Sequence, residues 1–316
     1  MLRSEPNPPA AELRPQLLPR VELARVIVSA EAALLAIVGV QSVFAPPLDP
    51  LQLSLGLVAA AVLGWGVWRI GQDAPPAARP FADDTQWVPW DWTDVVLFFP
   101  GAFVVGAFLI NITVHIAQPL TSGLDSEVST AVQSFVAQAA YYVGALFNLW
   151  VLVWLRRGGT LSHLGFRRFQ WWWVPVAVAG AVGTLLIAGY LQELMQQSFP
   201  SLPNTQCTAV RHDYGHILAL AIIVTCFIAP LAEETVFRGF LYGWLRKASP
   251  ALIAIPASAA VFSAVHNVWL LAVPLFFVGC VLALFYQASR SIFPSVIVHA
   301  LFNLPGIISI LYATSC

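Results

Sequence analysis

The sequence predicts an all-α polytopic transmembrane protein with eight or nine spans and a cytoplasmic N-terminus. Of the 316 residues, 59% are hydrophobic and only 10% are charged, whereas soluble domains carry about 25% charged residues. Charges are nearly absent from two long stretches: residues 95–155 contain only Asp125 and Glu127, and residues 248–316 contain only Arg290. This composition excludes a soluble enzyme and a nucleic-acid-binding protein.

Apolar windows of about 20 residues, the length that crosses a bilayer, define the individual spans. The least certain boundary separates the seventh and eighth windows, where only Asn267 offers a turn. If these two windows merge, the chain has eight spans. The nine windows are 21–45, 50–70, 94–117, 129–155, 171–194, 216–245, 250–266, 268–288 and 292–313.

The basic residues give the predicted orientation, because Lys and Arg collect in cytoplasmic loops. With nine spans and the N-terminus inside, the loop arginines and the one lysine lie on the cytoplasmic side, and only Arg211 lies outside. Short loops and the lack of organelle signals favour a bacterial inner membrane. The arginine pairs at 156/157 and 167/168, with the loop 72–94, are expected to line a cytoplasmic entrance.

The chain divides into three predicted regions. Residues 1–20 form a disordered, proline-rich tail, and residues 21–93 form a two-helix hairpin followed by a cytoplasmic loop. Residues 94–316 form the transmembrane core, with the motifs described below in 217–312. In the first span, Glu22, Arg25 and Glu31 are expected to lie near the membrane interface on one polar face.

The sixth span contains three charged residues, which are costly inside a bilayer and therefore informative. Glu234 and Arg238 are four residues apart on one helical face, so they can form an ion pair. Glu233 is rotated by about 100° from Glu234 and can point elsewhere. Pro230 is expected to bend the helix just before it. An ion pair that fixes helix packing explains Glu234 and Arg238, whereas a spare carboxylate indicates a functional site.

Two later spans contribute histidines at helical spacing. Phe262 and His266 are four residues apart in the seventh span, and His299 and Asn303 are four apart in the ninth. A single buried histidine most often packs against a backbone carbonyl. Two of them near a Glu-Glu helix favour a shared site.

These motifs, in this order, resemble the CPBP family, also called ABI or type II CAAX prenyl endopeptidase-like proteins. The similarity rests on Glu233-Glu234-x-x-x-Arg238, Phe262-x-x-x-His266, Phe276-x-x-Gly279 and His299-x-x-x-Asn303. A short upstream segment, residues 164–167, resembles one that family members often carry. The order and spacing of all four motifs together make the resemblance specific.

The resemblance implies an intramembrane endopeptidase that cuts a peptide or protein substrate near its C-terminus or in its leader. It assigns Glu233 and His266 to activation of a water, and His299 and Asn303 to an oxyanion hole. Glu234, Arg238 and Phe262 would support them. The family is described both with and without a metal, so Glu233, His266 and His299 are also potential zinc ligands, and no cofactor is certain.

Two other functions stay open at the sequence level. The first is a non-catalytic membrane scaffold that binds a partner. In such a protein, the ion pair and the histidines would only fix the packing of the helices. A proton-coupled transporter would use intramembrane Glu and His as a relay, although the sequence has no inverted repeat of the kind that transporters often show. A leader peptide, a bacteriocin or a membrane-protein tail is expected as the substrate in the enzyme reading.

Overall fold

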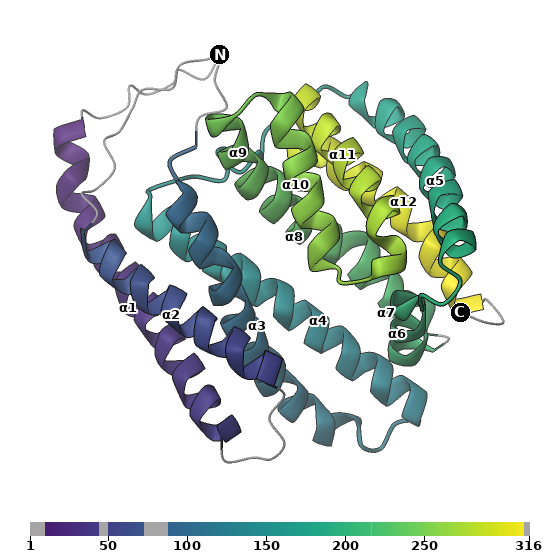
Figure 1. Cartoon of the computed structure of the whole chain (residues 1–316), viewed down its shortest axis with the longest axis horizontal. Helices are drawn as coiled ribbons and strands as arrows, with labels where there is room; N and C mark the ends of the chain where they lie inside the picture. The colour runs from purple at the N-terminus through teal and green to yellow at the C-terminus, as the bar shows by residue number, and fades with distance from the viewer. Residues whose placement is uncertain (1–9, 44–49, 73–87, 216, 313–316) are drawn as a thin grey trace. The chain divides into compact units, whose positions relative to one another are not determined.

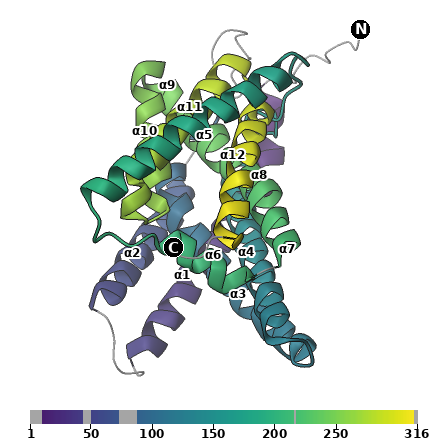
Figure 2. The ribbon, with the colours of Figure 1, turned by 90° about the vertical axis from the view of Figure 1, so that its right-hand side faces the viewer.

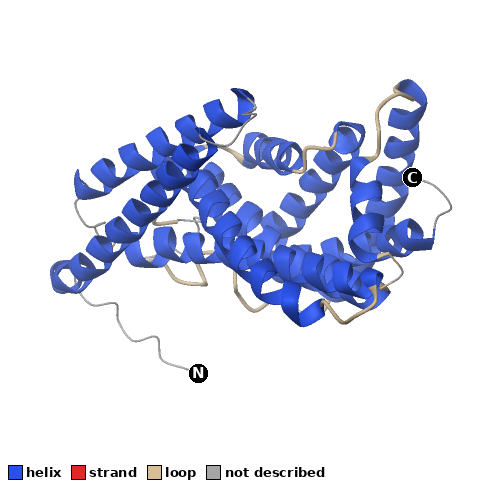
Figure 3. Cartoon of the chain, turned by 90° about the horizontal axis from the view of Figure 1, so that it is seen from below, coloured by secondary structure: helices blue, strands red, loops and turns tan. Residues whose placement is uncertain are grey.

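The computed structural model describes residues 10–43, 50–72, 88–215 and 217–312. These residues form helices joined by short connections and contain no strand (Figure 3). The predicted all-α class is therefore confirmed. Residues 1–9 of the predicted tail and 73–87 of the predicted loop lie outside the described residues.

From residue 92 on, the helices follow the predicted windows to within a few residues. Figure 1 labels them along the chain. Three segments, η1 to η3, are wider π-helical stretches inside longer helices, and η4 is a single 3₁₀ turn. The elements are α1 Ala10–Val43, α2 Pro50–Gln72, α3 Trp92–Thr121, α4 Ser126–Trp150, η1 Val151–Arg156, α5 Trp173–Ser198, α6 Thr205–Tyr214, α7 Leu218–Ile222, η2 Ile223–Ile228, α8 Ala229–Glu234, η3 Thr235–Tyr242, α9 Gly243–Ala248, α10 Ala251–Val265, η4 Trp269–Leu271, α11 Ala272–Ser289 and α12 Ile292–Tyr312.

Six helices in the described part of the chain are long and apolar enough to cross a membrane. They are Trp92–Thr121, Ser126–Arg156, Trp173–Ser198, Leu218–Ala248, Trp269–Ser289 and Ile292–Tyr312. The predicted seventh span is α10, an apolar helix of 15 residues, which at 1.5 Å per residue falls short of a hydrocarbon layer about 30 Å thick. The total of eight or nine spans and the orientation stay predictions.

The turn between the seventh and eighth windows lies where the sequence placed it. Helix α10 ends at Val265, and Asn267 adopts a left-handed backbone conformation with φ 51°. Asparagine tolerates this conformation better than most residues. The predicted boundary at 266 to 267 is therefore correct. At the other end of the chain, α1 begins at Ala10 instead of residue 21, because Ala10, Ala11 and Glu12 favour a helix.

The chain forms two compact units, and helices α3 and α4 each contribute to both. The first unit contains residues 1–108 and 143–160, and the second contains 109–142 and 161–316. In the first unit, α1 packs against α2, and α1 also contacts η1. Within this unit, Gly144 of α4 lies so close to α3 that a Cβ atom there would be 2.8 Å from the Cα of Gly106. Two glycines therefore allow this close crossing of the helices.

An ion-pair network in the first unit holds the predicted entrance arginines Arg156 and Arg157. Arg156 donates to Asp94 at 2.6 Å, and Arg157 donates to Asp94 at 2.7 Å and to Asp91 at 2.8 Å. The side chains of Asp94 and Arg156 are buried. Burial of Asp91 opposes its ionisation, but a hydrogen bond from Thr93 and the charge of Arg157 outweigh it and lower the pKa of Asp91. The pair 156/157 is thus held by ion pairs with Asp91 and Asp94, and its place at a cytoplasmic entrance stays a prediction.

The predicted polar face of the first span is only partly present. Arg25 and Glu22 are exposed, 3.9 Å apart. Glu31 is only 3% exposed, and neither of its carboxylate oxygens has a hydrogen-bond partner among the described residues. Its helical position faces the packed side of α1, so the interfacial interpretation is wrong for Glu31.

The second unit contains α5, the interrupted helix α7 to α9, and helices α10 to α12 (Figures 1 and 2). Helix α11 packs against α10, α5 and α12. Gly279 permits a close approach of α11 to α10, because a Cβ atom there would lie 2.9 Å from the Cα of Ala259. Helix α12 also contacts η2 and α8. The four motif-bearing segments therefore lie side by side in one unit.

The close crossing of α3 and α4 yields a stability prediction. Replacing Gly144 with Leu should destabilise the protein by about 1–3 kcal/mol, because the side chain must displace the backbone at Gly106. Thermal unfolding of the detergent-solubilised protein measures this. Gly183→Leu in α5 is the matched control, since a Cβ atom at Gly183 has no neighbour within 4 Å. Equal melting temperatures for the two variants would contradict the prediction.

The segment between α4 and α5 provides a test of orientation. Residues 157–172 join two candidate spans and include Arg157, Arg167 and Arg168, so we expect this segment in the cytoplasm. A reporter enzyme that works only in the cytoplasm should be active when it is fused after Arg168, and a reporter that works only in the periplasm should be inactive there. Activity of a periplasmic reporter at this position would contradict the predicted topology.

Candidate functional site

The interrupted helix Leu218–Ala248 carries the two adjacent glutamates. Its short α-helical segment α8 begins with Ala229 and Pro230 and ends at Glu234, and π-helical segments lie on both sides of it. Proline is tolerated in a first helical turn because its missing N–H is not needed there. π-Helical turns change which face of a helix a residue occupies and are frequent at functional sites. The sequence predicted a bend at Pro230 but not these wider turns.

Glu234 is completely buried and joins two helices. Its Oε1 accepts a hydrogen bond from Nη1 of Arg238 at 3.0 Å and lies 2.9 Å from Nδ1 of His299 in α12. A carboxylate at this position can only accept, so Nδ1 of His299 carries the proton. The predicted ion pair between Glu234 and Arg238 is present, and His299 extends it to a third residue.

Arg238 is also completely buried and contacts two further helices. Its Nη2 donates to the carbonyl oxygen of Gly279 in α11 at 3.2 Å. Its guanidinium carbon lies 4.5 Å from the ring centre of Phe262 in α10, a geometry that favours a cation–π interaction. Arg238 therefore holds α10 and α11 beside the helix that carries the glutamates.

Glu233 points away from this ion pair. Its Oε1 accepts a hydrogen bond from the hydroxyl of Tyr142 at 2.7 Å, and its Oε2 lies 3.8 Å from Nε2 of His299. The side chain of Glu233 is 16% exposed, whereas that of Glu234 is 0% exposed. His299 thus lies between the two carboxylates, with one ring nitrogen toward each.

His266 and Asn303 each have one polar group bound to the backbone. Nδ1 of His266 lies 2.7 Å from the carbonyl oxygen of Phe262, so this nitrogen is the donor and Nε2 is left as an acceptor in the neutral ring. Nδ2 of Asn303 donates to the carbonyl oxygen of Thr225 in η2 at 2.7 Å. Its amide has a second N–H that this bond does not use.

A cavity of about 630 Å³ in the second unit contains these groups. Its lining is contributed by α4, α5, α6, η2, α8, α10, α11 and α12. Apolar side chains make up much of the wall, and a few polar groups converge on it, which is the usual composition of a ligand-binding cavity. Its polar lining residues include Tyr142, Glu233, His266, His299 and Asn303.

No zinc site is assembled among the described residues, where no three His, Cys, Asp or Glu side chains are arranged to hold one metal ion. Glu233, His266 and His299 each keep one potential donor atom outside the hydrogen bonds described above, namely Oε2 of Glu233 and Nε2 of each histidine. The zinc alternative with these three residues as ligands therefore stays a prediction.

The sequence reasoning missed Tyr142. Tyr142 lies in α4 and its hydroxyl is the hydrogen-bond donor closest to Glu233 among the described contacts. Two adjacent tyrosines, Tyr141 and Tyr142, stand in a largely apolar span, and a buried tyrosine hydroxyl usually needs a partner. This pair was the available signal, but a sequence alone does not say which acceptor it meets.

Residues 215–305 match the family model described as Type II CAAX prenyl endopeptidase Rce1-like. This segment is under a third of the 316 residues, and it includes the glutamates, both histidines and Asn303. No curated protein and no solved structure matches the chain significantly. This match confirms the family resemblance predicted from the motifs over residues 215–305. The six apolar helices long enough to span a bilayer support an integral membrane protein.

Proposed function

We propose that the protein is an intramembrane endopeptidase in which Glu233 activates a water molecule for attack on a peptide bond. The observation that carries this proposal is the division of labour between the two glutamates. One oxygen of the buried Glu234 is bound by both Arg238 and His299, whereas Glu233 lies on the cavity wall beside His299. A general base must reach both its water and the substrate, and only Glu233 has this access.

The proposed reaction uses a proton cycle on Glu233. The carboxylate removes a proton from water, and the resulting hydroxide forms a bond to the carbonyl carbon while the carbonyl electron pair moves to oxygen. When this tetrahedral intermediate collapses, the carbon–nitrogen bond breaks and the leaving amine takes the proton from Glu233. Nε2 of His266, free of the backbone bond, is suited to accept a hydrogen bond from the water.

The negative oxygen of the intermediate needs donors fixed in advance. Asn303 can supply the amide N–H that is not bound to Thr225, and His299 can supply Nε2–H when its ring is protonated. Glu234 orients that ring because it accepts from Nδ1. Arg238 and Phe262 act through position: Phe262 lies against the ring of His299, and Arg238 holds the Glu234 oxygen that binds His299.

The substrate is a peptide or protein segment that enters the cavity from the membrane. We expect cleavage near a C-terminus or in a leader, as for the membrane-protein tails and secreted peptides of a bacterial inner membrane. A non-catalytic scaffold is the second candidate function, and the hydrogen bond between Tyr142 and Glu233 favours it, because this bond gives Glu233 a structural partner.

Replacing Glu233 with Gln separates these two functions. Loss of the general base should lower the cleavage rate by about 10²- to 10⁴-fold, while the similar shape of Gln keeps the fold. Mass spectrometry of membrane and secreted peptides from cells with the native protein and with the variant measures the difference. Glu193→Gln, an exposed glutamate in α5, is the matched control.

The enzyme proposal fails if the native protein is folded and present, yet all three peptide inventories are identical. In that outcome, a partner protein that purifies equally with the native chain and with Glu233→Gln would support the scaffold.

Tyr142 should act by positioning Glu233. Tyr142→Phe removes one neutral hydrogen bond, worth about 0.5–1.5 kcal/mol, so the rate of the cleavage identified above should fall about two- to tenfold. The effect should be in kcat, with an altered pH profile and little change in KM. Tyr141→Phe is the control, because Tyr141 is 42% exposed and its hydroxyl donates to no described residue. Equal kcat values and pH profiles for the two variants would refute the role of Tyr142.

A further inference from the structure

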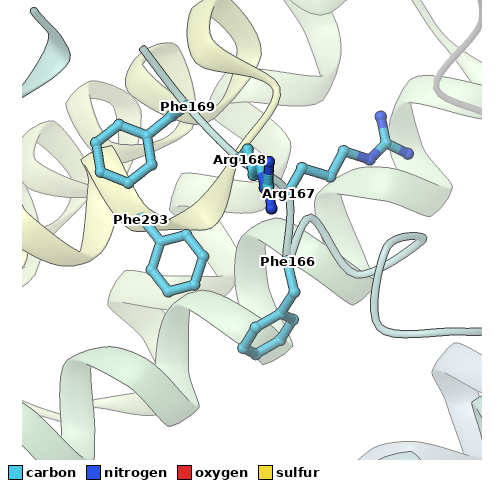
Figure 4. A pocket seen from close by; sticks show the side chains of 5 residues that line it. All are labelled: Phe166, Arg167, Arg168, Phe169 and Phe293. Atoms are coloured by element: carbon cyan, nitrogen blue, oxygen red, sulfur yellow. The ribbon is translucent and has the colours of Figure 1, made fainter. Parts of the chain in front are cut away.

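A second cavity, of about 450 Å³, lies in the segment between α4 and α5 and the start of α12. Its lining is three phenylalanines and two arginines: Phe166, Arg167, Arg168, Phe169 and Phe293. In Figure 4 the three phenylalanine rings lie on one side of the backbone, and the Arg167 side chain extends away from them. The cavity shares no lining residue with the one that contains Glu233. The arginine pair 167/168 therefore belongs to a separate feature of the second unit.

The backbone that carries the two arginines is fixed to the helices around it. The carbonyl of Gly165 accepts a hydrogen bond from the N–H of Ile292 at 3.0 Å, and the hydroxyl of Ser291 donates to the carbonyl of Arg167 at 2.8 Å. Gly165 has φ +84° and lies against Tyr286 and Ile292, where a Cβ atom would clash. This segment is a built part of the fold, so the arginines are presented in a defined place.

Among the described residues, the charge of this cavity has no acidic counterpart. In the part of the chain that the structure describes, neither Arg167 nor Arg168 has a carboxylate within ion-pair distance; Nε of Arg167 donates only to the carbonyl of Ser162. Two cations without an acidic partner favour an anionic ligand, and guanidinium groups match the geometry of phosphate oxygens.

The aromatic surroundings indicate where this ligand comes from. The ring of Phe293 lies 5.9 Å from the rings of both Phe166 and Phe169, so the three rings form one apolar wall beside the arginines. Immediately after this segment, Trp171 and Trp172 are 80% and 41% exposed. Exposed tryptophans concentrate at the headgroup level of membranes, where one ligand can offer both phosphate and hydrocarbon.

We propose that this cavity binds the headgroup of an anionic phospholipid, with its phosphate at Arg167 and Arg168 and the start of an acyl chain on the three phenylalanine rings. Basic pockets between membrane helices bind such headgroups in other proteins. The volume lies within the range of about 300–1,000 Å³ typical of small-molecule sites. This proposal does not depend on the proposed peptidase activity.

Native mass spectrometry of the detergent-purified protein tests the site directly. The protein is titrated with phosphatidylglycerol and, separately, with phosphatidylcholine of the same chain length. We expect the first phosphatidylglycerol molecule to bind more tightly than phosphatidylcholine. The double variant Arg167→Gln/Arg168→Gln should weaken phosphatidylglycerol binding about tenfold or more, because each arginine contributes about 1 kcal/mol. Arg211→Gln in α6 is the matched control and should bind like the native protein.

Several results would overturn the proposal. They are equal binding of the two lipids, an unchanged affinity in the double variant, or an equal loss in Arg211→Gln. Displacement of phosphatidylglycerol by the same concentration of inorganic phosphate would indicate a phosphate site instead. Displacement by a peptide with a free C-terminus, but not by the same peptide with an amidated C-terminus, would indicate a substrate site. If the double variant does not fold, Arg168→Gln alone changes the more exposed arginine, and unchanged binding there also refutes the proposal.

Discussion

The second unit is organised around a carboxylate that has no access to solvent. Glu234 accepts from Arg238 on its own helix and contacts His299 on α12. Removing one partner from a buried ion pair typically costs about 3–5 kcal/mol, because the remaining charge is left unpaired. Every helix that carries a motif is therefore constrained by the requirement that this small group of charges stays together.

The same group of charges explains why Gly279 and Phe262 belong to the motifs although neither has reactive chemistry. Gly279 lets α11 approach α10, and its carbonyl accepts a hydrogen bond from Arg238. Phe262 offers its ring to the guanidinium of Arg238 and its carbonyl to His266. A side chain at the first position or a smaller residue at the second would change how Arg238 is held. The polar network and the close packing of the helices are thus one arrangement.

Much of the fold follows from hydropathy alone, because the membrane imposes one length and one composition on every span. The helix limits agree with the windows to within a few residues in 92–312, and the turn at Asn267 was predicted from a single asparagine. The sequence also predicted the pair Glu234 and Arg238, since helical spacing fixes which neighbours can meet. The order of the motifs also predicted the resemblance that the family model shows over residues 215–305.

Contacts between distant segments could not be predicted in this way. Tyr142 is 91 residues from Glu233, and Arg156 is 62 residues from Asp94. Charge counting assigns an arginine to a loop but does not show that a buried aspartate binds it. The burial of Glu31 was missed for the same reason, because one face of a helix is assigned to lipid, water or protein only when its neighbours are known.

The hydrogen bond from Ile292 to Gly165 has a mechanical consequence. It fastens the segment before α5 to the first residue of α12, and the same helix carries His299 and Asn303 about two and three turns further on. An α-helix transmits displacement along its axis much as a stiff rod does, because its backbone hydrogen bonds resist stretching. A disturbance at the anchored end therefore reaches His299, which lies between the two glutamates. Residues 161–170 are distant from the site in the chain, but this connection links them to it mechanically.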